Sequence, residues 1–174
     1  MIKNLKKDCS KRFYSHGYPT RKEENWKFTS SRNLSKFENN VSQKPKIDHL
    51  DIDKNTILFV NGILDQGVLK NFKYNDKLKV IDLNVLKEKS TLKFSKNFIK
   101  DSVFNLGIMD FKEGFYFEFD KNLVLEEPIK LVNYYSADKD FSRITSFNIF
   151  NIQSGSEISF IEDDINDGES SFNL

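Results

Sequence analysis

The sequence predicts an α+β fold that is mostly β. This prediction is based on the spacing of apolar residues, which changes along the chain. Apolar residues recur at helical spacing near the N-terminus and again between Thr91 and Met109. From Gly114 onward they alternate, or cluster in short runs separated by polar turns, which is typical of strands. We therefore expect three regions: an N-terminal helical region (1–46), a small α/β region (47–113) and a β region (114–174).

Composition supplies a substantial core. The 174 residues include 17 Phe, and the formal net charge is only +1. The charge is uneven, because residues 1–47 carry 12 Lys and Arg against 4 Asp and Glu, while residues 48–174 carry 15 against 22. The N-terminal bases are scattered among polar groups, which favours a solvated helix face over a nucleic-acid site.

The sequence also indicates a compartment. Cys9 is the single cysteine, so no internal disulfide can form, and a reducing environment fits. No run approaches the ~20 apolar residues of a membrane span, and no apolar segment of a secretory signal follows the basic N-terminus. We expect a cytoplasmic protein that binds neither membrane nor nucleic acid.

The N-terminal helix is predicted over residues 2–16, where Leu5, Cys9 and Phe13 form one stripe. Gly17 suits a left-handed helix end, and Pro19 blocks continuation.

A second helix is predicted after this corner. Thr20 and Glu23 have capping-box spacing. Trp26 and Phe28 follow, and we expect both to be buried as an anchor for the N-terminal helices. Leu34 and Phe37 indicate a brief further turn before a linker at 41–46.

The middle region begins with an apolar strand, Thr56–Val60, followed by Asn61-Gly62, a dipeptide favoured in tight hairpins. Val68–Tyr74 and Lys77–Leu83 are further predicted strands. A helix is predicted within Thr91–Met109 from the spacing of Leu92, Ile99, Val103 and Leu106, with Gly107 and Gly114 bracketing its end.

Five strands are predicted after Gly114. They centre on Phe115–Phe119, on Ile129–Val132, on Phe147–Ile152, on Ile158–Ile161 and on Ser170–Leu174. Their spacing suits either an antiparallel sandwich or successive turns of a β-solenoid. The last strand carries no capping element, and we expect the chain to be part of a longer protein.

Motifs that carry chemistry are scarce. His16 and His49 are far apart in sequence, and neither has metal-ligand spacing with Cys9 or with paired carboxylates. Phosphate loops, dinucleotide fingerprints and nucleophile elbows are lacking. We expect a protein that is not an enzyme, with no catalytic, cofactor-binding or metal-binding residue.

The acidic run 162–169 places its Gly and Glu out of register for a calcium loop. We expect a solvated turn between strands. An alternative is a docking face for a basic partner, because residues 157–169 hold six acids and no base.

Residues Gly17 to Thr29, Gly-Tyr-Pro-Thr-Arg-Lys-Glu-Glu-Asn-Trp-Lys-Phe-Thr, resemble the N-terminal signature of the SufD family, subunits of the SUF iron–sulfur cluster assembly machinery. The paralogous SufB family lacks this segment. Further stretches resemble the family in the same order: Leu58–Gly62, Val103–Leu106, Glu127–Ile129 and Ile161–Glu162.

The resemblance implies a fold in which the helical and α/β regions precede the first rungs of a right-handed parallel β-helix. It implies a non-enzymatic scaffold subunit that acts with SufB and SufC, mostly through regions beyond residue 174. The iron–sulfur cluster would be handled by the full complex, and this segment would bind no cofactor. The alternative from the residues alone is a self-contained β-sandwich module that binds a carbohydrate or another extended ligand.

Overall fold

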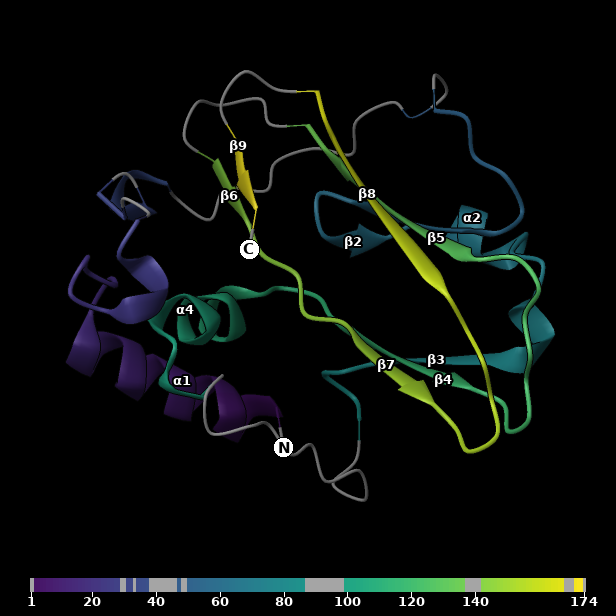
Figure 1. Cartoon of the computed structure of the whole chain (residues 1–174), viewed down its shortest axis with the longest axis horizontal. Helices are drawn as coiled ribbons and strands as arrows, with labels where there is room; N and C mark the ends of the chain where they lie inside the picture. The colour runs from purple at the N-terminus through teal and green to yellow at the C-terminus, as the bar shows by residue number, and fades with distance from the viewer. Residues whose placement is uncertain are drawn as a thin grey trace.

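The computed structural model of the chain describes residues 2–28, 31–32, 34–37, 47, 50–86, 99–136, 142–167 and 171–173. It is an α+β structure with mixed sheets (Figure 1). The helices are α1 (Ile2–His16), α2 (Gln66–Lys70) and α4 (Ser102–Asp110). The strands are β1 (Thr56–Val60), β2 (Ile63–Leu64), β3 (Leu78–Asp82), β4 (Phe115–Phe119), β5 (Ile129–Tyr135), β6 (Ser142–Ile144), β7 (Ile149–Ile152), β8 (Phe160–Asn166) and β9 (Ser171–Asn173).

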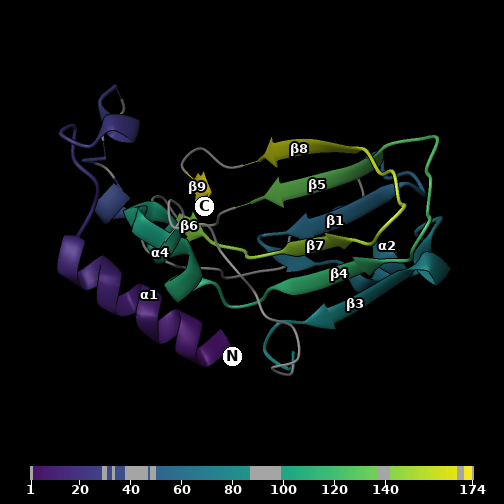
Figure 2. The same ribbon diagram turned by 60° about the horizontal axis from the view of Figure 1, so that its bottom comes forward.

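Three sheets contain these strands. One has the order β2-β1-β5-β8, the second β3-β4-β7, and the third β6-β9. Antiparallel pairing joins β1 to β2 and β3 to β4, whereas every other pair of neighbours is parallel. Figure 2 shows strands β1, β3, β4, β5, β7 and β8 side by side toward one end of the molecule, helices α1 and α4 at the other, and the short strands β6 and β9 near α4.

The parallel pairs repeat in chain order. Strands β4, β5 and β6 pair respectively with β7, β8 and β9. Asn151 therefore contacts Glu118, 33 residues earlier, and Asp164 contacts Asn133, 31 residues earlier. The chain returns to the same three sheets after each such interval, and the second set of strands lies directly beside the first.

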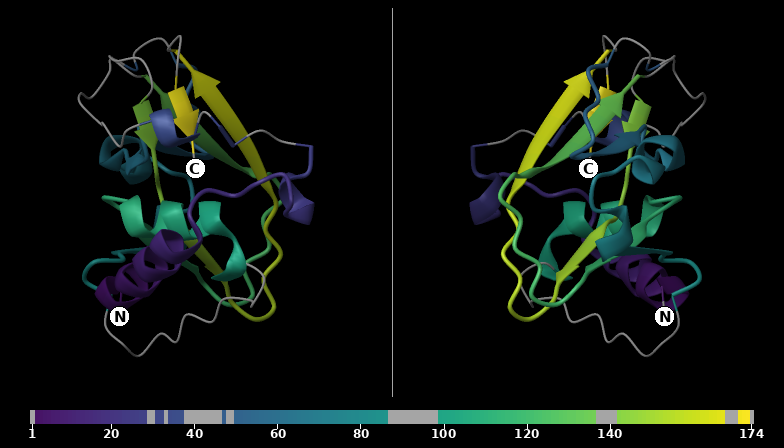
Figure 3. Two further views of the ribbon diagram at one scale, coloured as in Figure 1. Left: turned by 90° about the vertical axis from the view of Figure 1, so that its left-hand side faces the viewer. Right: turned by 90° about the vertical axis from the view of Figure 1, so that its right-hand side faces the viewer.

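The main core lies between the first two sheets. Its buried members include Ile57 and Phe59 from β1, and Phe115, Phe117 and Phe119 from β4. Side chains on β4 alternate between buried and partly exposed positions, as a strand with one face in the core requires. Figure 3 views the molecule along its long axis, where the sheets border this common core.

Two smaller clusters cover other surfaces. Helices α1 and α4 pack together around Ile2, Cys9, Ile108 and Phe111. On the outer face of the first sheet, a separate cluster is built around β1 and β5, with Leu58 and Val132 among its buried members. Apolar burial of this kind contributes about 25 cal/mol per Å² of apolar area removed from water.

Several sequence predictions are confirmed. The first helix covers residues 2–16, its stripe residues Cys9 and Phe13 are buried, and Gly17 has a φ of +73°. The strand at 56–60 ends in a hairpin whose turn residues Asn61 and Gly62 have φ values of 50° and 78°. The predicted strands at 77–83 and after Gly114 correspond to β3, β4, β5, β7, β8 and β9.

The strand predicted over Val68–Tyr74 is wrong, because this stretch begins within α2. The Asp65 side chain accepts a hydrogen bond from the Val68 backbone N–H at 2.9 Å, which caps the helix start. Leu69 and Phe72 then reach the main core from a helix and its C-terminal turn.

The predicted anchor after Pro19 is also corrected. Thr20 donates its backbone N–H to Glu23 at 2.8 Å, as the capping box requires, but only a 3₁₀ turn follows, over Glu24–Trp26. So short a turn forms no helical face, and Trp26 is only partly buried while Phe28 is 91% exposed. The brief turn predicted near Leu34 is present as a 3₁₀ turn over Leu34–Lys36.

The helix predicted within Thr91–Met109 is confirmed in its second half. Asp101 accepts a hydrogen bond from the Phe104 backbone N–H at 2.8 Å and begins α4. The helix ends at Asp110, between Gly107 and Gly114, as predicted. Leu92 lies outside the described residues, as does the linker at 41–46.

Candidate functional site

The best candidate site is a cavity of about 350 Å³ between the first sheet and the segment that leads into β7. We call it the inner cleft. Its apolar floor is formed by Phe59, Leu131 and Phe150, and its rim includes Ser146 and Asn148. Four polar side chains from β5 and β8 form the remaining wall: Asn133, Tyr135, Glu162 and Asp164.

Strand alternation places these four side chains in the cleft. On β5, Ile129 and Leu131 face the core, so Asn133 and Tyr135 face the same way. On β8, Phe160 faces the core, and Glu162 and Asp164 follow at the same period. The inward face of β8 changes from apolar to polar at Glu162, opposite Leu131, and the inward face of β5 changes one pair later, at Asn133 opposite Asp164.

Asn133 joins the two carboxylates. Its Nδ2 atom donates to Glu162 Oε1 and to Asp164 Oδ1, and both distances are 2.9 Å. One side-chain amide thus uses both of its hydrogens across the β5–β8 ladder. These charge-assisted hydrogen bonds hold the two acidic side chains on the cleft wall.

Tyr135 belongs to the same wall and is 8% exposed. Burial raises the pKa of its hydroxyl above the ordinary value, and the nearby negative charges of Asp164 and Glu162 raise that pKa further. Tyr135 is therefore neutral at physiological pH and acts as a hydrogen-bond donor toward Asp164.

The chemistry of the cleft favours an organic cation, such as a charged amine, over a metal ion. The lining contains two carboxylates and no Lys, Arg or His, so its charge is negative. The Asn133 amide occupies the place between the carboxylates that a shared metal ion would take. Among the described residues no group of three or more His, Cys, Asp or Glu is arranged to hold a metal ion.

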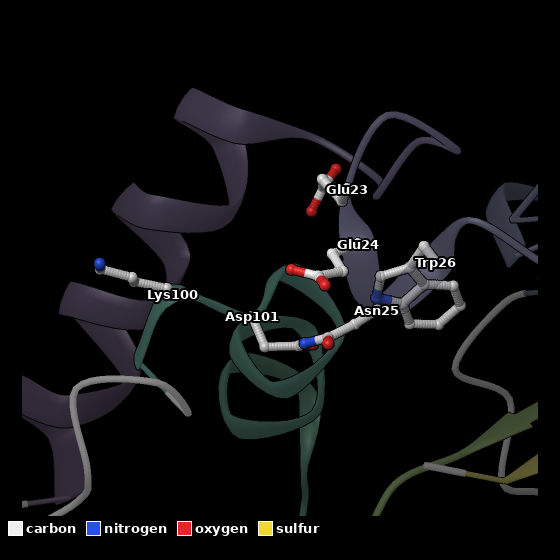
Figure 4. Close-up of a pocket in the computed structure, with 6 residues that line it drawn as sticks. All are labelled: Glu23, Glu24, Asn25, Trp26, Lys100 and Asp101. Carbon is white, nitrogen blue, oxygen red and sulfur yellow. The ribbon is translucent and has the colours of Figure 1, made fainter.

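A second hollow, of about 240 Å³, is formed by the segment after Pro19 and the start of α4. Figure 4 shows Trp26 and Lys100 pointing to opposite sides, with Glu24 and Asp101 between them. Asp101 caps α4, and Glu23 on the rim accepts a hydrogen bond from the Thr20 backbone N–H. These two carboxylates serve the local fold, so the hollow is the weaker candidate.

Among the described residues, the structure does not bring the residues considered for chemistry in the sequence into a common site. His16 is exposed at the end of α1, with Nδ1 2.9 Å from the Arg12 carbonyl oxygen, and His49 lies outside the described residues. Cys9 is buried between helices, and burial raises the pKa of its thiol. Over the described residues, no helix is both long and apolar enough to cross a membrane.

Over its described residues, 162–167, the acidic run is mostly exposed, as predicted, but the predicted turn is wrong from Glu162 to Asn166. Glu162, Asp163 and Asp164 lie within β8, because β8 continues the ladder with β5 as far as Asn166. Sequence reasoning did not identify Asn133 or Tyr135. The available signal was the change from apolar to polar residues at the inward positions of β5.

Comparisons with known proteins provide no assignment: the chain matches no protein-family profile and no curated protein.

Proposed function

We propose that the chain belongs to a scaffold subunit of the SUF machinery, which acts in the cytoplasm with SufB and SufC in iron–sulfur cluster assembly. The main observation behind this proposal is the repeated parallel pairing of successive strands: β7, β8 and β9 pair in parallel with β4, β5 and β6 respectively. Such a repeat offers long open surfaces to other proteins. The resemblance of residues 17–29 to the SufD signature supports the choice of the SufD family in this proposal.

In this proposal the two sets of strands are the first rungs of a right-handed parallel β-helix. The interval of 33 or 31 residues between paired positions fits one rung that crosses three sheets. Right-handed crossovers are the rule where parallel strands of one sheet are connected. The antiparallel strands β2 and β3 then close one end of the stack.

The segment acts by binding and positioning and not by catalysis. Its thiol, Cys9, is buried between α1 and α4, away from solvent. The full complex supplies the cluster chemistry, and the partners bind mostly through other regions of the subunit.

Deletion of the reading frame that contains this chain tests the proposal. Under iron limitation, the activity of iron–sulfur dehydratases should fall, while an enzyme without a cluster keeps its activity. Expression of the same frame from a plasmid should restore the dehydratases. Equal dehydratase activity in the deleted and parental strains would refute the proposed function.

A second candidate is a module that binds a carbohydrate or another extended ligand in the inner cleft, because its carboxylate and amide oxygens can accept hydrogen bonds from neutral hydroxyl groups as well as from cations. Polar side chains over an aromatic floor are typical of such sites. Saturable binding of a neutral oligosaccharide, lost in Tyr135→Phe and kept in Tyr14→Phe, would favour this candidate over the scaffold.

A further inference from the structure

A third hollow, of about 330 Å³, lies within the segment that follows α1. We call it the arginine hollow, because Arg21 and Arg32 both line it. The remaining lining residues are Pro19, Thr20 and Ser31, so the lining contains two cations and no carboxylate. Its volume lies within the range of about 300–1,000 Å³ that is usual for small-molecule sites.

A contact between two distant points of this segment brings the arginines together. The Ser31 hydroxyl donates a hydrogen bond to the Pro19 carbonyl oxygen, which joins positions 12 residues apart. Pro19 is fully buried, so this contact fixes the base of the loop. Arg21 and Arg32 follow the two joined positions closely in sequence, and both therefore lie at the same hollow.

The acids of this segment do not neutralise the two arginines. Glu23 and Glu24 are the only acids in the sequence between Pro19 and Arg32, and both line the second hollow, beside α4 (Figure 4). Glu23 also accepts a hydrogen bond from the Thr20 backbone N–H at 2.8 Å. Over the described residues the ion pairs involve other cations, so the charge of the arginine hollow is not balanced by a described carboxylate.

Two guanidinium groups beside a hydroxyl fit a phosphate dianion. Arginine stays charged at physiological pH, and its planar fork donates two parallel hydrogen bonds to an oxyanion. Thr20 Oγ1 accepts from the Lys22 backbone N–H at 3.4 Å, which leaves its hydroxyl hydrogen to donate to a ligand. A phosphate monoester carries about −1.5 to −2 charges at pH 7, which two arginines balance, whereas a carboxylate carries one.

We propose that the arginine hollow binds the phosphate group of a small soluble phosphate monoester. Arg21 and Arg32 donate to the phosphate oxygens, and the Thr20 hydroxyl is a further donor. The organic part of the ester occupies the rest of the hollow. This binding goes beyond the proposed scaffold function and does not depend on it, so either can fail without the other.

Calorimetric titration of the protein with glycerol 3-phosphate tests the proposal. Saturable binding is expected at pH 7, and dimethyl phosphate, a diester with one charge, should bind at least about tenfold more weakly. Affinity for glycerol 3-phosphate should fall about tenfold from pH 7 to pH 5, because the second pKa of the ester is about 6 and its second charge is lost. The arginines keep their charge over this range.

Protein variants separate the arginine hollow from general charge attraction. Arg21→Gln and Arg32→Gln should each weaken binding at least about tenfold, because each removes one charged fork. Arg21→Lys keeps the charge without the fork and should recover only part of that loss. Lys22→Gln is the matched control: Lys22 is exposed in the same segment but does not line the hollow, so affinity should change by less than about twofold.

Equal weakening by Lys22→Gln and by Arg21→Gln would overturn the proposal. So would equal affinity for glycerol 3-phosphate and dimethyl phosphate, a comparison that uses only the unaltered protein. Binding to vesicles that contain phosphatidic acid, without binding of glycerol 3-phosphate, would overturn it in favour of a lipid surface.

Discussion

Phe117 of β4 stacks on Phe150 of β7, with ring centroids 4.7 Å apart and planes 10° from parallel. The two residues occupy the same register position of the parallel ladder. Phe59, from the opposite sheet, meets the Phe117 ring edge-on at 6.0 Å. One aromatic cluster therefore joins successive strands of one sheet to the facing sheet, and this cluster should carry much of the stability.

Phe117→Ala should lower the free energy of unfolding by about 3–5 kcal/mol, because a fully buried ring leaves a cavity. Phe28→Ala is the control: Phe28 is 91% exposed, so the change should stay within about 0.5 kcal/mol. Urea denaturation measures both. Similar losses in the two variants would contradict the placement of the core.

Gly62→Ala should destabilise the chain by about 1–3 kcal/mol. The φ of Gly62 is +78°, and an added Cβ would lie 3.3 Å from both Ile144 Cγ2 and Ser146 Cβ. Gly107→Ala is the opposite case, because a Cβ there meets nothing within 4 Å inside helix α4. It should stabilise by about 0.5–1 kcal/mol. Thermal unfolding should give shifts of opposite sign, and shifts of the same sign would count against the hairpin geometry.

Tyr134 should make stability fall at alkaline pH. Burial, together with the hydrogen bond that its hydroxyl donates to Asp167, raises the pKa of Tyr134 to about 12 from the ordinary tyrosine value of 10.0. Between these two values the unfolded chain has lost the proton and the folded chain keeps it. This contribution to stability is therefore complete below about pH 10 and is lost as the pH rises toward about 12.

Tyr134→Phe should flatten the decline of unfolding free energy across that pH window. Tyr14→Phe is the matched control, since Tyr14 is 76% exposed, and should leave the slope unchanged. Ultraviolet absorbance of the phenolate follows the titration directly. A slope that is identical in the Tyr134 variant and the parent chain would rule out this source.

Cys9 should be protected from thiol reagents in the folded chain. It is 1% exposed, and burial raises the pKa of its thiol, which lowers the reactive thiolate fraction. Labelling should be at least roughly 100-fold slower in native buffer than in denaturant, because it requires opening of the α1–α4 contact. Fast labelling under native conditions would show that α1 does not pack as described.

Local signals in the sequence predicted local structure well. Asn61-Gly62 predicted a hairpin because the dipeptide itself tolerates positive φ, and alternation over Phe115–Phe119 predicted β4. The strand predicted over Val68–Tyr74 failed because the Asp65 cap outweighs an apolar run. The signal that was missed, the helix-capping Asp65, is also a local feature of the sequence.

Long-range features could not be predicted in the same way. Nothing in the residues of β1 alone specifies parallel pairing of Ile57 with Leu131, because that register depends on the packing of both sheets. The cleft wall is similar, since Asn133 meets Glu162 and Asp164 only when β5 and β8 are neighbours. The prediction that Phe28 is buried was wrong for the same reason. The Thr20–Glu23 cap indicates where a turn begins but not which residues pack against it.

The molar mass of a purified complex tests most directly whether this chain acts with SufB and SufC. The full product of its reading frame should be co-expressed with both proteins from the same organism, purified through a tag on this subunit and examined by light scattering. A single species whose mass accounts for all three subunits is the expected result. Elution of the tagged subunit without SufB and SufC would contradict its role as a SUF scaffold.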